Sequence, residues 1–503
     1  MAKQVPDRAQ VVIIGGGIVG ASVAYHLAEL GWDDVVLLER NTLTSGTTWH
    51  AAGLVGCLRA THNMTRLAAY SAELYDTLEH EMGHPTGFRK VGSLSVADNP
   101  ERMEELVRGA GMANAFDVDV EVITAEDLCG RYPLLNPEGI VGGVWLPGDG
   151  QASPVDTTMA LAAVAKEKGV RILEGVSVGR IRTADGRAIG VDTDQGPIDA
   201  EHVVTAAGMW SHQLGRDIGV NIPLHACEHF YLVTEPIPNL PSGLPVLRDT
   251  DNCIYVKEEA GRLMVGAFEP VAKPFGMDGI PTDRPFMQLD EDWEHLAPVW
   301  EAACKRIPAL VDVGIRLFFN GPESFTPDDR YLLGETPELR NHWVATGFNS
   351  IGMQSAGGAG KVLAEWIVNG RPPMDLWTST SAACSPSRPT AGTSATGRLR
   401  PSVCCTPCTG RSARSKRPVA FAAPRSMTAL LTLGPATVRT AAGNGRTGTP
   451  LRAWSRSTST PTGARTGSNT RRPSTGPAGR VRPCSTRPRW PSCSSRVRTL
   501  TPC

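Results

Sequence analysis

Apolar and polar positions along residues 11–38 follow two different periods in succession. Residues 11–14 (VVII) are a continuous β-branched run, which predicts a strand buried on both faces. The apolar positions after it recur at spacings of three and four residues, which predicts one face of a helix. These positions are Ile18, Ala21, Ala24, Leu27 and Ala28. Residues 35–38 (VVLL) predict a second strand, so the order of elements indicates a parallel, Rossmann-type α/β domain.

Shorter periodic segments of both kinds occupy the middle of the chain. Short strands are predicted at residues 91–97, 229–235, 253–259 and 262–268. Amphipathic helices are predicted at residues 103–113 and 293–307. Together these segments predict a second domain of the α+β class, with a mixed sheet, inserted into the first domain.

Length and composition set the scale of the protein. A chain of 503 residues with 41% hydrophobic residues is long enough for two or three domains. No uninterrupted run of about 18 apolar residues occurs, so we expect no contact with a membrane through a spanning helix. The N-terminus lacks the basic and then apolar pattern of a secretion signal, and we therefore expect a cytoplasmic protein.

The formal net charge of −1 conceals two unlike segments. Residues 1–377 hold all 51 acidic residues and 29 of the 50 lysines and arginines, whereas residues 378–503 hold the other 21 basic residues. The second segment is too poor in apolar residues to offset its conformational entropy, which predicts a disordered basic tail. Its clustered cysteines lack a histidine and a second Cys-x-x-Cys pair, so we expect no metal site. It has few aromatic residues for stacking, so we expect no nucleic-acid partner.

The strongest local signal is the glycine pattern that follows the first strand. Gly15, Gly17 and Gly20 form the spacing G-x-G-x-x-G between the predicted strand and helix. One glycine of this pattern permits a tight turn, one lets the backbone approach a pyrophosphate, and one lets helix and strand pack closely. The helix N-terminus supplies unpaired N–H groups and a positive dipole end for phosphate. Glu39, at the end of the second strand, is placed to bind a ribose diol, so the segment predicts a dinucleotide site.

The next segment indicates which dinucleotide. Residues 41–54 (NTLTSGTTWHAAGL) resemble the D-amino-acid-oxidase-like flavoproteins, and more closely their sarcosine and dimethylglycine dehydrogenase branch. In that branch the motif carries a histidine joined covalently to the flavin ring, and His50 occupies its position. The resemblance therefore implies FAD as the cofactor, attached through His50.

The resemblance extends over nearly all of residues 8–377. The segments that carry it include 147–154 (PGDGQASP), 203–211 (VVTAAGMWS), 321–328 (GPESFTPD) and 347–361 (GFNSIGMQSAGGAGK). It implies that the backbone of Val178 contacts adenine and that Gly352 and Met353 open a helix toward the flavin edge. The dipole of such a helix stabilises negative charge on reduced flavin. The other residues expected to bind FAD are Arg40, Ser45, Thr47, Thr48, Ala207, Gly208, Trp210 and Gly347.

The resemblance also divides the chain into segments of two domains and a tail. The expected segments of the FAD-binding domain are residues 8–84, 147–222 and 321–377. The expected segments of the substrate domain are residues 85–146 and 223–320. In such flavoproteins the sheet of the second domain covers the flavin and forms the substrate pocket. The tail is residues 378–503.

Oxidation of an N-methylated amine by flavin needs a neutral nitrogen lone pair and an anchor for the substrate carboxylate. His229 and Tyr255 match positions of the branch near the flavin, so we expect His229 to keep the amine deprotonated and Tyr255 to position it. His225 is an alternative to His229, because residues four apart on one strand share a face. Arg59, nine residues after His50, is the expected carboxylate clamp, with a surface ion pair as the alternative.

The resemblance implies an FAD-dependent amine dehydrogenase acting on sarcosine or dimethylglycine. The expected reaction transfers a hydride from the methyl group to flavin N5, and hydrolysis of the iminium then gives formaldehyde and the demethylated amine. The expected electron acceptor is an electron-transfer protein or oxygen. The sequence leaves open an oxygen-using amine oxidase, an inactive FAD-binding remnant and a tail that binds nucleic acid. Glu323 and Asp328 lie in a matched segment, but the sequence indicates no chemical role for them.

Beyond Trp377 the tail matches the family only out of frame. Members of the branch continue with the peptide DVDIRR and, farther on, with a folate-binding domain. Codons for the family-like peptides DVDIRR, ARGVRRSPLHDR and YSYGRQNWFEH, read one base later, encode in order residues 378–383, 418–429 and 460–470. The hypothesis is therefore that one base is missing after the Trp377 codon, with a natural basic arm as the alternative. Tetrahydrofolate is expected as a cofactor only where the folate-binding domain is present.

Overall fold

The computed structural model describes residues 5–376, 379 and 380, and the predictions made for residues 381–503 lie outside them. Within these residues the strands form two large sheets and one small one. The eight-stranded sheet contains β1 (Arg8–Ile14), β2 (Val35–Glu39), β8 (Arg171–Glu174), β9 (Val178–Ala184), β10 (Arg187–Thr193), β11 (Gly196–Thr205), β18 (Leu332–Thr336) and β19 (Leu339–Thr346). The nine-stranded sheet contains β4 (Ser93–Ala97), β5 (Glu121–Ile123), β6 (Gly142–Leu146), β12 (His225–Thr234), β13 (Val246–Asp249), β14 (Ile254–Glu259), β15 (Arg262–Ala267), β16 (Pro274–Phe275) and β17 (Ile315–Phe325). The small sheet pairs β3 (Leu54–Val55) with β7 (Gly150–Gln151).

The helices of the described residues connect these strands. The α-helices are α1 (Ile18–Glu29), α2 (His62–His80), α3 (Pro100–Ala115), α4 (Ala125–Arg131), α5 (Pro154–Glu167), α6 (Ser211–Asp217), α7 (Trp293–Arg306) and α8 (Gly352–Asn369). The single 3-10 turns are η1 (Thr48–His50), η2 (Gly208–Trp210) and η3 (Pro308–Leu310).

The eight-stranded sheet has the parallel centre that the first residues predict. Strand β1 lies between β11 and β2 and is parallel to both, and β8 continues the parallel run beyond β2. Val11 and Ile13 of β1 pack in the core beneath the helices, whereas Val12 and Ile14 pack in the core on the other face. Both faces of β1 are therefore buried, which explains its uninterrupted apolar sequence.

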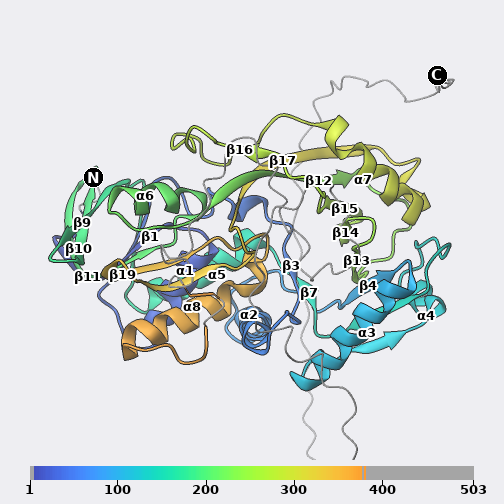
Figure 1. Cartoon of the computed structure of the whole chain (residues 1–503), viewed down its shortest axis with the longest axis horizontal. Helices are drawn as coiled ribbons and strands as arrows, with labels where there is room; N and C mark the ends of the chain where they lie inside the picture. Colours follow the sequence, from blue (N-terminus) through green and yellow to red (C-terminus); the bar gives the residue numbers. More distant parts are fainter. Residues whose placement is uncertain (1–4, 377–378, 381–503) are drawn as a thin grey trace, which may run out of the picture. The chain divides into compact units, whose positions relative to one another are not determined.

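Helix α1 lies between α5 and α8 on one face of this sheet, and α2 packs against α8 (Figure 1). The positions predicted to face the core are buried, but Ser22 and His26 are buried as well. The Ser22 hydroxyl donates to the carbonyl of Ala356 on α8, and His26 Nδ1 lies 2.7 Å from the Ser22 carbonyl oxygen. The helix is therefore covered around most of its circumference, which its apolar periodicity alone did not indicate.

The nine-stranded sheet contains the strands predicted for the middle of the chain. Strands β12 and β17 form a long antiparallel pair, and β12, β15, β14 and β13 follow as neighbours (Figure 1). Helices α3 and α7 confirm the two predicted amphipathic helices. Apolar residues of α7, including Leu296 and Val299, share one core with residues of β12, β14 and β15. The other face of these strands is left for the site described below.

The chain passes between the two large sheets more than once. Strands of the eight-stranded sheet come from residues 8–39, 171–205 and 332–346, and the nine-stranded sheet takes the strands from residues 93–146 and 225–325. Strand β17 runs across the predicted boundary between residues 320 and 321. The fold is therefore a Rossmann-type α/β sheet combined with a mixed-sheet α+β unit. Among the described residues, no helix combines the length and the apolar character that crossing a bilayer requires.

Candidate functional site

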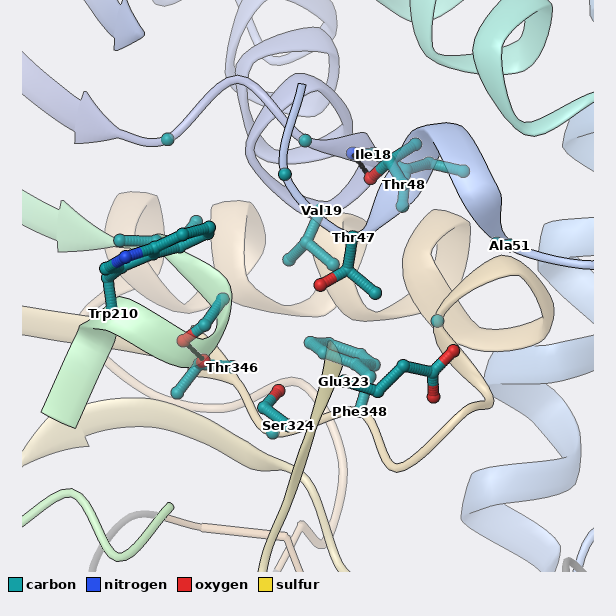
Figure 2. Close-up of a pocket in the computed structure, with 18 of the residues that line it drawn as sticks. Ile18, Val19, Thr47, Thr48, Ala51, Trp210, Glu323, Ser324, Thr346 and Phe348 are labelled. Atoms are coloured by element: carbon teal, nitrogen blue, oxygen red, sulfur yellow. Dashed lines mark hydrogen bonds between the residues drawn. The ribbon is translucent and has the colours of Figure 1, made fainter. Parts of the chain in front are cut away.

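A cavity of about 390 Å³ joins the carboxyl ends of β1 and β2 to one face of the nine-stranded sheet. Every residue predicted for the site lines this cavity except Gly20 and Arg59. The predicted residues in its wall are Gly15, Gly17, Glu39, Arg40, Ser45, Thr47, Thr48, His50, Val178, Ala207, Gly208, Trp210, His229, Tyr255, Gly347, Gly352 and Met353. In Figure 2, Trp210 and Glu323 lie on opposite sides of the view, with Thr47 and Thr346 between them.

The turn between β1 and α1 leaves no room for side chains at two glycines. Gly15 has φ of +114°, and a Cβ there would meet the carbonyl oxygen of Ala206 at 2.5 Å. A Cβ at Gly20 would lie 2.0 Å from the carbonyl oxygen of Gly15, so Gly20 permits close packing of the helix on the turn. Gly20 therefore supports the cavity wall without lining it.

The N-terminus of α1 presents backbone donors to the cavity. Its N-cap, Gly17, has no side chain to bond the first turn, and only the Ile18 N–H is taken by a neighbouring side chain, Thr48 Oγ1 at 3.1 Å (Figure 2). Val19 lines the cavity beside them. Unpaired N–H groups together with the positive end of the helix dipole make this position suitable for a pyrophosphate.

Glu39 holds the glycine turn in place. Its Oε2 accepts a hydrogen bond from the Gly16 N–H at 2.8 Å, and its Oε1 accepts one from the Asn41 N–H at 2.9 Å. Beside it, the Arg40 guanidinium lies 3.9 Å from the centre of the Trp210 ring, an arrangement typical of a cation–π contact. This end of the cavity therefore combines a carboxylate, a cation and a flat aromatic surface.

A segment without helix or extended strand, residues 276–286, crosses this end of the cavity, and we call it the strap. The strap is held by three hydrogen bonds to the walls: Trp210 Nε1 donates to the Pro281 carbonyl, Gln213 Nε2 to the Ile280 carbonyl, and the Phe286 N–H to the Ser45 carbonyl. Thr282 of the strap lines the cavity. The Phe286 ring also meets the Trp49 ring edge-on, with the centroids 5.6 Å apart. The strap was not predicted from the sequence, because residues 276–286 have no periodic pattern.

His50 lies in the cavity wall as the last residue of η1. Its ring stacks on Phe319 with centroids 4.9 Å apart and packs against Trp49, and the side chain is buried. Burial lowers the pKa of His50 to about 4, although the nearby Glu323 carboxylate acts in the opposite direction. The imidazole is therefore neutral at physiological pH and has a nitrogen lone pair available.

Glu323 and Asp328 have different positions, although both come from one matched segment. Glu323 lies on β17 and lines the cavity near His50, and its Oε2 accepts a hydrogen bond from the Ser350 hydroxyl. The Asp328 Oδ1 accepts a bond from the Arg330 N–H at 3.2 Å and belongs to a turn outside the cavity. Glu323 is therefore part of the site, and Asp328 has a local structural role.

The N-terminus of α8 forms a second uncapped helix end in the wall. Helix α8 begins at Gly352 as expected, and its N-cap, Ile351, makes no side-chain cap. Gly352, Met353 and Gln354 line the cavity, and the Tyr75 hydroxyl holds the Met353 carbonyl at 2.9 Å. The buried Gln354 Oε1 has no hydrogen-bond partner among the described residues. The start of α8 therefore offers polar groups to whatever fills the cavity.

The nine-stranded sheet supplies the opposite wall. His229 and Tyr231 of β12, Tyr255 of β14 and Phe268 line the cavity, and the Phe268 ring contacts the rings of His229 and Tyr255. His225, the alternative to His229, lies at the start of β12 and does not line the cavity. The structure therefore brings His229 and Tyr255 to one aromatic surface and leaves His225 outside it.

Arg59, the predicted carboxylate clamp, is not among the residues that line the cavity, and its role as a clamp stays a prediction. Arg59 is 6% exposed, so it does not lie at the surface, where the alternative of an ion pair had placed it. Its Nη2 donates to the Gly56 carbonyl at 3.1 Å, and its backbone bonds to Thr65 of α2. The backbone bonds to Thr65 fix the main chain of Arg59 against α2. The arginine that does line the cavity on the side of the nine-stranded sheet is Arg248 of β13, which the sequence analysis missed.

Comparison with known proteins agrees with this site. The family model described as FAD dependent oxidoreductase matches residues 10–366. The chain therefore belongs to the family of FAD-dependent oxidoreductases that includes D-amino-acid oxidase, and it is a flavoprotein by family. The residues present fit the cofactor, because two uncapped helix ends and the glycine turn line one cavity.

Curated relatives match the chain over three quarters of its length. The chain is 43% identical to 4-methylaminobutanoate oxidase (formaldehyde-forming) of Paenarthrobacter nicotinovorans, covering 74% of this chain and 45% of that protein. It is 40% identical to the mitochondrial pyruvate dehydrogenase phosphatase regulatory subunit of Mus musculus, covering 74% and 43%. It is 39% identical to the mitochondrial sarcosine dehydrogenase of Homo sapiens, covering 75% and 41%. The chain thus spans less than half the length of these relatives.

A solved structure with the same fold is L-proline dehydrogenase from P. horikoshii. It superposes with a TM-score of 0.69 at 26% sequence identity, and the match covers 75% of this chain and 98% of that chain. The matched residues therefore correspond to nearly the whole of that chain.

Proposed function

We propose that this protein catalyses FAD-dependent oxidative demethylation of a small N-methylated amino acid. The observation that carries the proposal is one continuous cavity, which runs from the glycine turn and helix α1 to an aromatic sheet face with His229 and Tyr255. The relatives named 4-methylaminobutanoate oxidase (formaldehyde-forming) and sarcosine dehydrogenase support the same class of substrate. Among substrates of this class we consider sarcosine, dimethylglycine and longer N-methylated amino acids.

Each part of the chain has a role in this reaction. When bound, FAD would supply the two-electron acceptor for a hydride from the N-methyl carbon. His229 keeps the substrate nitrogen in its neutral form, because the imidazole can accept the proton of the amine and the aromatic wall disfavours a charged amine. Tyr255 positions the substrate against the cofactor. Water then hydrolyses the iminium product to formaldehyde and the demethylated amine.

Two further features serve the cofactor in this proposal. Glu39 and the α1 N-terminus bind the ribose and the pyrophosphate, and the N-terminus of α8 stabilises the negative charge that reduction places on the flavin. The neutral imidazole of His50 is the group through which the flavin ring becomes covalently attached. The protein acts in the cytoplasm and passes electrons to a carrier protein or to oxygen. Transfer of formaldehyde to tetrahydrofolate requires a folate-binding domain.

The covalent attachment gives the first test. Acid precipitation of the purified wild-type protein is expected to give a yellow pellet, whereas His50→Ala is expected to give a colourless pellet with flavin in the supernatant. His80→Ala, which removes an exposed imidazole at the end of α2, is the control and is expected to keep the yellow pellet. A yellow His50→Ala pellet would contradict the attachment, and a protein that gains no flavin after reconstitution would contradict the whole proposal.

Turnover gives the second test. The holoenzyme is incubated with sarcosine, dimethylglycine or 4-methylaminobutanoate and an artificial electron acceptor, and formaldehyde is measured. Formaldehyde production is expected with at least one of these substrates. Peroxide formed under air without the artificial acceptor identifies an oxidase.

A regulatory role without turnover is the second candidate function. It is favoured by the 40% identity to a protein named as the regulatory subunit of a phosphatase. Flavin binding without any formaldehyde production would support this role over the proposed enzyme.

A further inference from the structure

A row of neighbouring residues crosses the nine-stranded sheet at the cavity. Arg248 of β13 pairs with Tyr255 of β14, Tyr255 pairs with Gly266 of β15, and Gly266 pairs with Tyr231 of β12. Gly266 leaves space for the Tyr255 ring, because a Cβ at Gly266 would lie 1.9 Å from a ring carbon. Arg248, Tyr255 and Tyr231 all line the cavity, so the row forms one continuous surface there.

Arg248 is the cation of this surface that no carboxylate neutralises. It forms no ion pair within 4 Å in the part of the chain that the structure describes, and its buried Nε has no hydrogen-bond partner there. Glu39, Arg40, Asp217 and Glu323 also line the cavity. Glu323 accepts a hydrogen bond from the Ser350 hydroxyl. Arg248 is half-buried, and a guanidinium whose buried Nε has no partner is costly, so its position in the wall favours an anionic ligand.

The groups around Gly56 leave a small space beside this guanidinium. A Cβ at Gly56 would lie 3.5 Å from Arg248 Nη2, 3.4 Å from Gln354 Oε1 and 3.3 Å from Asp149 Oδ2. Asp149 is already used, because its Oδ1 accepts from the Cys57 N–H and its Oδ2 from the Ser93 hydroxyl. Among the described residues, Asp149 is therefore occupied by other donors, whereas Arg248 Nε has no hydrogen-bond partner.

We infer that Arg248 binds the carboxylate of the substrate and so selects N-methylated amino acids over N-methylated amines that lack a carboxylate. This inference rests on the proposed function and specifies how its substrate class is recognised. The carboxylate takes two of the guanidinium N–H groups, while the aromatic row beside Arg248 contacts the methylene and methyl groups. Arg248 thereby binds the carboxylate, the role that the sequence had predicted for Arg59.

The test measures binding separately from turnover. The probes are 3,3-dimethylbutanoate and 3,3-dimethylbutanamide, which have the same shape, contain no oxidisable amine and differ in charge. Their affinities for the flavin-loaded protein are measured from the change in the visible flavin spectrum. Because hydrogen bonds to a charged partner are the strong ones, Arg248→Met is expected to weaken 3,3-dimethylbutanoate binding about tenfold to a hundredfold and to leave 3,3-dimethylbutanamide unchanged.

Three comparisons make the result specific. Arg248→Lys keeps the charge but not the planar fork, and it is expected to restore part of the lost affinity. Arg316→Met, on an exposed position of β17 outside the cavity, is the matched control and is expected to change neither affinity. In turnover, Arg248→Met is expected to raise the KM of the amino-acid substrate far more than it lowers kcat.

Two outcomes separate the inference from the proposed function. If Arg248→Met weakens both probes equally, or neither, the carboxylate is not bound by Arg248 and the inference is overturned. If the wild-type protein binds 3,3-dimethylbutanoate through Arg248 but oxidises no N-methylated amino acid, the anchor stands and the proposed reaction fails.

Discussion

At the scale of single residues, the glycines of the described structure differ in how much space an added side chain would find. Gly20 on α1 faces the backbone of the preceding turn, and the carbonyl oxygen of Gly15 would lie 2.0 Å from an added Cβ. The oxygen belongs to the main chain and the backbone fixes the position of a Cβ, so no rotation of a side chain relieves the contact. Gly111 on α3, in contrast, is exposed and has no atom within 4 Å of an added Cβ.

We therefore expect opposite effects from two alanine substitutions. Gly20→Ala is expected to lower the free energy of unfolding by about 3 kcal/mol, because overpacking displaces the helix from the turn. Gly111→Ala is expected to raise it by up to about 1 kcal/mol, since alanine is the better helix former. Urea denaturation of the two variants measures both changes, and equal effects would contradict this explanation.

The glycine turn and Glu39 were predictable because they lie in one short segment with a local pattern, and the family resemblance indicated the other cofactor residues. The glycine turn, Glu39 and residues 45–50 each occupy a short segment whose residue types determine its local conformation. Arg248 was not predictable in this way, because it reaches the cavity through its pairing with Tyr255 on the next strand. The position of Arg59 was not predictable either, since its main chain is held by hydrogen bonds to Thr65 of α2.

At the scale of elements, buried strands and amphipathic helices were predicted well. The burial of helix α1 on several sides was not predicted. Strands β4, β12, β14 and β15 and helices α3 and α7 lie where the periodic segments predicted them. A helical apolar period indicates one buried face of a helix. Helix α1 also packs against α5 and α8 through small residues, so more than one of its faces is buried. The strap has no period at all, and its position depends on single hydrogen bonds to distant segments.

The contact between Phe286 of the strap and Trp49 has a measurable consequence for the cofactor. Phe286→Ala removes the edge-on ring contact but no residue that lines the cavity. An aromatic pair of this kind contributes about 0.5–1.5 kcal/mol. In a His50→Ala background, where flavin is not tethered, Phe286→Ala is therefore expected to release FAD roughly twofold to tenfold faster.

The release rate is measured from the recovery of flavin fluorescence after dilution. Val311→Ala serves as the control, because it also shortens an exposed apolar side chain but lies at η3, outside the cavity wall. An unchanged rate in Phe286→Ala would show that the strap does not retain the cofactor.

At the scale of the whole described molecule, buried histidines link stability to pH. Burial lowers the pKa of His26 to about 3 and the pKa of His342 to about 4, from an ordinary value of 6.5. The unfolded chain therefore binds protons at a higher pH than the folded one does. This contribution to stability is complete above pH 6.5 and is lost as the pH falls toward 4.

His342→Gln is expected to flatten that dependence. His342 is fully buried between the hydroxyls of Thr205 and Thr336, and glutamine can bond with such hydroxyls but cannot take a proton. The urea midpoint of the wild-type protein is expected to fall more steeply between about pH 7 and pH 5 than that of the variant. His80→Gln, at an exposed position on α2, is expected to leave the slope unchanged. Parallel slopes for all three proteins would contradict the role of His342.

The two large sheets also contribute different parts of the site. The eight-stranded sheet and its helices line the part of the cavity that fits the cofactor, and the nine-stranded sheet supplies His229, Tyr255 and Arg248. The sequence indicated this division through its alternation of βα segments with mixed segments. It did not indicate which side chains of the second sheet face the cavity, because that depends on the pairing of strands from distant parts of the chain.

The strap adds a consequence for how the protein matures. It is bonded to the cavity walls at residues 280, 281 and 286, so we expect a bound dinucleotide that holds these walls in place to stabilise the strap as well. We therefore expect chains synthesised during riboflavin shortage to keep residues 276–286 accessible to proteases, and loaded chains to resist cleavage there. Vitamin supply would then determine the lifetime of the polypeptide as well as its activity.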